Sequence, residues 1–217
     1  MDFLNNCVFI DESGFSINLK SSRAWAPRGE SAVVTTPLTK APTHSIIEAI
    51  STVGVVNLSI RIPPTPSKIR KIQGGNKRKI PDAETRKTEP TGTTTGHYLR
   101  FLNDTLDIMD KQDSMKDFYL IMDNAPIHTS KAIEQAVKRR NRDYKCVYLP
   151  PYSPELNPIE QFWALIKRKV KRNKLDGTDT LELRIIEAAN EIPIQYLINM
   201  VQHSKDHFLN SLNKTPI

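Results

Sequence analysis

Tyr119-Leu120-Ile121-Met122-Asp123-Asn124-Ala125-Pro126-Ile127-His128 is the segment around which the chain is organised. Its first four residues form an apolar run, which predicts a strand buried on both faces. The run stops at Asp123, and Asn124 and Pro126 then prevent the strand from continuing. An acid therefore stands at the carboxyl end of a central strand, where open α/β sheets place their sites.

The same design occurs near the start of the chain. The apolar run Cys7-Val8-Phe9-Ile10 is followed by Asp11-Glu12 and then by the breaker pair Ser13-Gly14. We expect a second strand that ends at an acid. Two strand tips that each present a carboxylate form half of a site for a hard cation.

The remaining segments predict a mixed sheet covered by helices. Two β-rich runs, 45–51 and 53–60, predict a hairpin, and 31–36 predicts a short strand. The run 144–149 predicts a further strand. Apolar periodicity predicts helices over 97–109, 130–141, 157–174, 180–190 and 194–212. This order of elements indicates an α/β fold with a central mixed sheet flanked by helices.

Length, charge and cysteine content limit which classes of protein fit the sequence. The 217 residues suit one domain, which we expect to span 1–217. A net charge of +7 is compatible with a polyanionic partner, although a merely soluble basic protein is an equally good interpretation. Cys7 and Cys146 lie in apolar runs and are expected to be reduced, and no Cys/His spacing suggests zinc. No membrane span or signal peptide is visible, so we expect an intracellular protein, nuclear in a eukaryote and otherwise cytoplasmic.

Residues 63–95 differ in composition from the rest of the chain. They are rich in proline, glycine and threonine and contain few large apolar residues, so they cannot bury themselves. We expect a flexible basic insertion, either a solvated loop or an arm that follows a phosphate backbone. Its basic residues are Lys68, Arg70, Lys71, Lys77, Arg78 and Lys79.

Glu160 is the candidate third acid, and it has two interpretations. It stands three residues after Asn157, where a glutamate can close a capping box at the start of a helix. The stiff, proline-rich lead-in 150–158 instead favours accurate placement of the first helical turn against the sheet. Both interpretations stay open at the level of the sequence.

Four blocks of the sequence carry a resemblance to a known family. They are Phe9-Ile10-Asp11-Glu12-Ser13-Gly14-Phe15, Trp25-Ala26-Pro27-Arg28-Gly29, the 120–128 part of the central segment, and Leu149-Pro150-Pro151-Tyr152-Ser153-Pro154-Glu155-Leu156-Asn157-Pro158-Ile159-Glu160-Gln161-Phe162-Trp163. Together they resemble the catalytic domain of Tc1/mariner and IS630-type transposases, in the DDE superfamily of endonucleases. The resemblance spans roughly residues 7–175 and implies an RNase H-like fold with five strands. The helix-turn-helix modules usual in that family are not found in this sequence.

The resemblance implies a chemistry. Asp11, Asp123 and Glu160 match the catalytic and metal-binding triad of the family, and the Asp123–Glu160 spacing is close to the usual one. The expected cofactor is Mg²⁺ or Mn²⁺, in a pair of ions that binds the attacking and leaving oxygens of a phosphodiester. The expected reaction is hydrolysis at transposon-end DNA, followed by joining of the 3′-OH to target DNA at a TA dinucleotide. A homodimer is also implied.

Further residues near these blocks are weaker candidates. Glu12, Asn124 and His128 lie beside the presumed site, and His128 is interpreted more readily as a capping or packing residue than as a phosphate contact. Trp25 and Trp163 are interpreted as core residues. The candidates for contacts to the DNA backbone, besides the basic insertion, are Arg28, Lys167, Arg168, Lys171 and Arg172.

Two other functions compete with a transposase. A ribonuclease H or retroviral-type integrase would share the fold, but the Pro-Tyr-Ser-Pro-Glu-Leu-Asn-Pro-Ile-Glu block (151–160) argues against both. A non-catalytic DNA-binding module, derived from a domesticated transposase, would retain the basic character without the chemistry. The complete triad disfavours that alternative.

Overall fold

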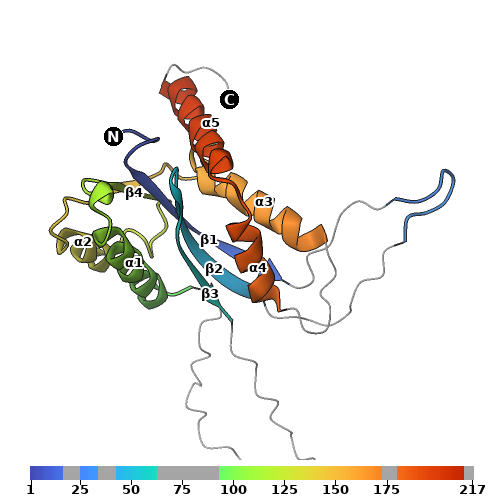
Figure 1. Ribbon diagram of the computed structural model, residues 1–217, viewed down its shortest axis with the longest axis horizontal. Coiled ribbons are helices and arrows are strands. Elements are labelled where there is room, and N and C mark those ends of the chain that lie inside the picture. Colours follow the sequence, from blue (N-terminus) through green and yellow to red (C-terminus); the bar gives the residue numbers. More distant parts are fainter. Residues whose placement is uncertain (17–24, 34–42, 63–92, 173–179, 213–217) are drawn as a thin grey trace, which may run out of the picture.

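The computed structural model describes residues 1–16, 25–33, 43–62, 93–172 and 180–212. A five-stranded sheet with the strand order β3-β2-β1-β4-β5 forms its centre (Figure 1). The strands are β1 (Cys7–Ser16), β2 (Thr43–Ser51), β3 (Gly54–Arg61), β4 (Tyr119–Met122) and β5 (Lys145–Tyr148). The first three strands pair antiparallel, and β4 lies parallel to both β1 and β5. The predicted mixed sheet is confirmed, including the hairpin of β2 and β3.

Strand β1 is longer than predicted. It continues through Asp11-Glu12-Ser13-Gly14 to Ser16, because its antiparallel pairing with β2 runs as far as Ser16 opposite Thr43. Gly14 fits this ladder tightly, since a Cβ atom there would lie 3.3 Å from the Thr43 methyl group. The prediction that Ser13-Gly14 ends the strand is therefore wrong. Parallel pairing with β4 does stop at Phe9, so Asp11 lies just beyond that shared segment.

Helices cover both faces of the sheet (Figure 1). On one face, α1 (Thr95–Asp110) and α2 (Lys131–Lys138) close a core that includes Val8 and Ile10 of β1. On the other face, α3 (Pro158–Arg172), α4 (Leu181–Asn190) and α5 (Ile194–Leu212) close a core that includes Phe9 and Phe15. Alternate residues of β1 thus enter opposite cores, as the two-residue period of a strand requires.

The helix boundaries follow local signals. Thr94 caps α1: its side-chain oxygen accepts a hydrogen bond from the His97 N–H, and its own N–H donates one to Nδ1 of the His97 ring. The last turn of α2 ends at Lys138, earlier than predicted, because Arg140 turns away to pair with Asp107 and Asp110 of α1. Two short 3₁₀ helices, η1 (Asp113–Met115) and η2 (Pro154–Leu156), complete the described elements.

Trp163 confirms its predicted place in the core, where its ring packs edge-on against Phe15 at 5.9 Å between centroids. The same prediction for Trp25 is wrong, because its side chain is 102% exposed. Residues 25–33 form a surface turn, in which the Glu30 N–H donates a hydrogen bond to the Pro27 carbonyl. Cys7 and Cys146 are free thiols, as predicted.

Several predictions fall on other parts of the chain. The predicted strand 31–36 is not formed over 31–33, and its remainder lies outside the described residues. The basic insertion also lies outside them, apart from 93–95, where α1 begins. Among the described helices, none is long and apolar enough to cross a membrane.

Candidate active site

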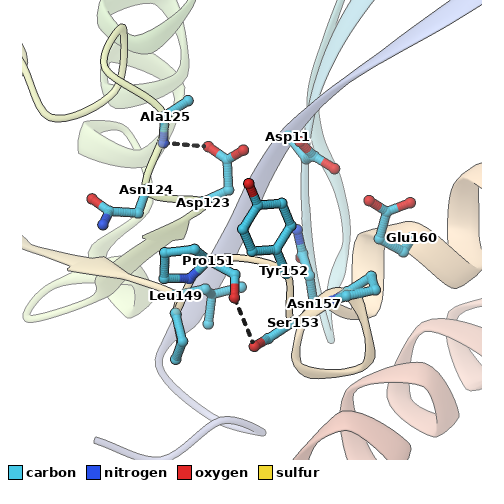
Figure 2. Close-up of a pocket in the computed structure, with 12 residues that line it drawn as sticks. Asp11, Asp123, Asn124, Ala125, Leu149, Pro151, Tyr152, Ser153, Asn157 and Glu160 are labelled. Carbon is cyan, nitrogen blue, oxygen red and sulfur yellow. Dashed lines mark hydrogen bonds between the residues drawn. The ribbon is translucent and has the colours of Figure 1, made fainter.

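The three predicted acids line a single pocket. Asp11 comes from β1, Asp123 follows β4, and Glu160 belongs to the first turn of α3. Figure 2 shows their carboxyl groups along one side of the pocket, with the ring of Tyr152 standing beside them. The fold therefore brings together side chains that lie 112 and 37 positions apart in the sequence, by subtraction of the residue numbers.

The sheet topology explains the first two positions. Strands β1 and β4 are parallel neighbours, paired up to Phe9 and Ile121. Each acid stands two residues beyond that last pair, so both side chains leave the sheet on the same face at the same edge. The loop from Pro150 to Asn157 then crosses this edge and delivers α3, whose first turn carries Glu160.

Asp11 lies at the bottom of the site and is only 8% exposed. The Glu12 N–H donates a hydrogen bond of 2.7 Å to its Oδ1. Burial, together with the nearby charges of Glu160 and Asp123, raises the pKa of Asp11 to about 7, although that hydrogen bond acts to lower it. The pocket thus holds negative charge that the protein itself leaves partly uncompensated.

Asp123 is held by His128. The Nδ1 of His128 makes a short hydrogen bond to Asp123 Oδ1, and the Ala125 N–H donates to the same oxygen at 3.2 Å. The hydrogen bond from His128 keeps the pKa of Asp123 below its ordinary value. On the opposite side of the imidazole, Nε2 lies 3.5 Å from Glu12 Oε1.

The His128 ring is itself fixed in place. It is 2% exposed and lies against the Tyr98 ring of α1, with 4.1 Å between the centroids. Burial disfavours its positive charge, but the bonds to Asp123 and Glu12 outweigh burial and raise the pKa of His128 to about 9. The imidazolium therefore bridges two carboxylates and orients Asp123. The interpretation of His128 as a helix cap is wrong, whereas its packing role is confirmed.

The structure also decides between the two interpretations of Glu160. In a capping box, the Glu160 side chain would accept the Asn157 N–H. That N–H instead donates to the Pro154 carbonyl at 3.0 Å, so Glu160 is released to face the pocket. Asn157 lines the same pocket, and its buried Oδ1 has no hydrogen-bond partner among the described residues.

The donor set fits a hard divalent cation. Carboxylate and amide oxygens line the pocket, and the pKa of Asp11 is raised mainly by burial and also by the charges of Glu160 and Asp123. Within the described residues, no three His, Cys, Asp or Glu side chains are already gathered closely enough to hold an ion. The Asp123 carboxylate is engaged by His128, so closing the site requires small side-chain movements around an entering ion.

The other predicted residues differ in where they lie. Asn124 lines the pocket, and Glu12 reaches it only through His128. Lys167 lies above the Phe15 ring, with its ammonium 5.4 Å from the ring centre. Arg28, Arg168 and Lys171 are exposed, while the Arg172 side chain and Lys68–Lys79 lie outside the described residues. Contacts of these basic residues to DNA stay predictions.

Sequence reasoning assigned no role at the site to Tyr152, Tyr98 or the Asn157 side chain. Tyr98 is a regular member of an apolar helical stripe, so nothing in the sequence distinguishes it from a core residue. Tyr152 carried a better signal, because it stands within the proline-rich lead-in that resembles the family block.

Comparisons with known proteins agree with this geometry. The family model described as DDE superfamily endonuclease matches residues 82–182. The Tc3 transposase of Caenorhabditis elegans is 34% identical over 98 residues, which cover 44% of this chain and 29% of that protein. The Tcb2 transposase of Caenorhabditis briggsae is 35% identical over 74 residues, which cover 34% of this chain and 26% of that protein.

Solved structures of the Mos1 mariner transposase share the fold. A paired-end complex with Mn aligns with a TM-score of 0.73 at 14% identity, over 99% of this chain and 56% of that one. The Mos1 catalytic domain aligns with a TM-score of 0.64 at 12% identity, over 98% of this chain and 83% of that one. The chain is thus similar to DDE superfamily endonucleases over residues 82–182, to the Tc3 and Tcb2 transposases in sequence, and to the Mos1 transposase in fold.

The described part of this chain has the RNase H-like fold of the Mos1 catalytic domain. The matched regions span less than a third of the two curated relatives, so their whole-protein activities are not transferred by the alignment alone. One Mos1 paired-end complex contains the left transposon end, and others contain Mn or Mg. These facts belong to Mos1.

Proposed function

We propose that this chain is the catalytic domain of a DNA transposase that uses Mg²⁺ or Mn²⁺. It hydrolyses a phosphodiester bond at a transposon end and joins the freed 3′-OH to target DNA, at TA as the family resemblance implies. The observation that carries the proposal is the convergence of Asp11, Asp123 and Glu160 in one pocket from three separate elements. The partner is DNA, and a homodimer would bring two ends together.

Each acid has a distinct part in this proposal. Asp11 is the most buried of the three, and the charges of both other carboxylates act on it, so it would be suited to share metal ions with each of them. Asp123 and Glu160 would each hold one. Two divalent ions bound there would lower the pKa of an attacking water and offset the charge on the leaving oxygen.

The remaining residues position these acids. His128 orients Asp123 through Nδ1, and Glu12 holds the other nitrogen of the same ring. Hydrogen-bonded partners of this kind fix the rotamer of a ligating carboxylate and tune its affinity for the ion. Asn157 contributes an amide at the pocket whose oxygen is available to water or to an ion.

Nicking of DNA tests the proposal. The wild-type chain should cut an end-labelled duplex in Mn²⁺, and Asp123→Ala should not. Glu155→Gln is the matched control, because Glu155 belongs to the same lead-in loop but is not among the residues that line the pocket. A chain that binds the duplex and never cuts it would support the non-catalytic alternative, and cutting of the RNA strand of a hybrid would support a ribonuclease.

A further inference from the structure

Tyr152 is the most unusual residue at the rim of the pocket. Its side chain is 102% exposed, although it lines the same pocket as Asp11 and Glu160. A single exposed aromatic residue is common on protein surfaces. The backbone of Tyr152 makes it exceptional, because φ is 59°, in the left-handed region that bulky residues avoid.

The other residues with this conformation show what is typical. In the described part of the chain, the remaining non-glycine residues with positive φ are Asp117 and Asp143. Short polar side chains tolerate the left-handed region because they form local hydrogen bonds. A glycine or asparagine at position 152 would meet the turn without strain. The chain instead places a large ring there and gains no burial from it.

The neighbouring residues hold this ring in position. Pro151 precedes Tyr152 and Pro154 follows two residues later, so two prolines restrict the loop on either side. Ser153 Oγ donates to the Pro151 carbonyl at 3.4 Å and closes the turn. Figure 2 shows the Tyr152 ring standing at the mouth of the pocket, with its hydroxyl toward the carboxyl groups. A stiff loop thus presents an open aromatic face beside the acids.

We infer that Tyr152 is a stacking platform for the nucleobase next to the phosphodiester that enters the pocket. This inference rests on the proposed function, since it takes the substrate to be a DNA strand. A phosphate that reaches the nearly buried Asp11 must bring its flanking nucleotides against the rim, where the ring lies. Stacking on an aromatic side chain needs no particular base, so the contact holds the strand without reading its sequence.

Fluorescence of 2-aminopurine tests the inference on the whole 217-residue chain. The probes are single strands of about 16 nucleotides with one 2-aminopurine moved along them, bound in Ca²⁺ and, separately, cut in Mn²⁺ to locate the scissile bond. The base adjacent to that bond should be quenched by the wild type and by Tyr152→Phe. Tyr152→Asn, which tolerates the same backbone, should lose the quenching and bind about tenfold more weakly.

Controls separate this inference from the proposed function. Tyr196→Asn removes another half-exposed tyrosine, on α5, and should change neither quenching nor affinity. If Tyr152→Asn quenches and binds as the wild type does, the platform does not exist, even though the wild type cuts DNA. Loss in Tyr152→Phe equal to that in Tyr152→Asn would assign the role to the hydroxyl and overturn stacking. A wild-type chain that never cuts would instead refute the proposed function.

Discussion

Two buried acids lie opposite each other on neighbouring strands, and their surroundings differ. Asp11 on β1 is paired in register with Glu48 on β2, so both side chains belong to the same face of the sheet. Asp11 opens onto the pocket and is 8% exposed, whereas Glu48 is 0% exposed and is not among the pocket residues. Both oxygens of Glu48 lack hydrogen-bond partners among the described residues.

Burial raises the pKa of both groups, to about 7 for Asp11 and well above the ordinary value for Glu48. The two regions differ in whether a cation or a substrate can reach the acid. A cation or substrate can enter the pocket and compensate the Asp11 charge, but the packed core around Glu48 admits neither. A buried acid can thus take part in function where a cation can reach it through an opening. Where the core is sealed, the same kind of residue only lowers the stability of the fold.

The largest expected effect is on catalysis by Asp11. Asp11→Asn should lower the rate of DNA nicking in Mn²⁺ by about a thousandfold, because the bridging carboxylate is lost. Glu48→Gln is the control, since it removes the ionisable group of the opposite acid and should leave the rate near that of the wild type. If both variants lost the same fraction of the nicking rate, Asp11 and Glu48 would not differ in function as argued above.

The next effect concerns stability and belongs to Glu48. Glu48→Leu should raise the free energy of unfolding near pH 7 by about 2 kcal/mol, because a buried polar group without partners is replaced by an apolar one. Since the folded pKa of Glu48 is raised, its contribution to stability falls as the pH rises from the ordinary glutamate value toward the folded one.

Urea unfolding at about pH 5 and about pH 8 measures both expectations, and the variant should show a smaller loss between them than the wild type. Glu187→Leu, at an exposed position on α4, should change stability by less than about 0.5 kcal/mol. A destabilised Glu48→Leu chain would mean that Glu48 has a partner in solution.

The next prediction concerns His128, which holds Asp123 at the pocket. His128→Ala should lower the nicking rate about tenfold and raise the Mn²⁺ concentration needed for half-maximal rate, because Asp123 loses its orienting partner. His128→Asn retains a donor near the position of Nδ1 and should recover part of the loss. His97→Ala, which removes only a helix-capping ring, is the control. Unchanged metal dependence in His128→Ala would confine His128 to packing.

The smallest expected effect is a thermal shift. Millimolar Mg²⁺ or Mn²⁺ should raise the melting temperature by about 4 °C, since bound cations offset repulsion among the three carboxylates that line the pocket. Asp11→Asn should abolish the shift, and Glu48→Gln should retain it. No shift in the wild type would count against the metal site.

Much of this protein was predictable from its sequence. The apolar runs that end at Asp123 and pass through Asp11, and the proline-rich lead-in to Glu160, indicated a mixed sheet with acids at one edge. Local signals of this kind are reliable because strand and helix periods are written directly in the pattern of side chains. The extension of β1 to Ser16 was missed, since pairing with a distant strand overrides a local breaker.

Only the tertiary structure decided which of these residues act together. It placed His128 between Asp123 and Glu12, freed Glu160 from a capping role, and put Tyr152 at the pocket. It also showed Glu48 sealed opposite Asp11, although each is an acid within a largely apolar strand. Those outcomes depend on which elements meet and which side chains stay open to solvent, and such contacts between segments distant in the chain leave no periodic signal in the sequence.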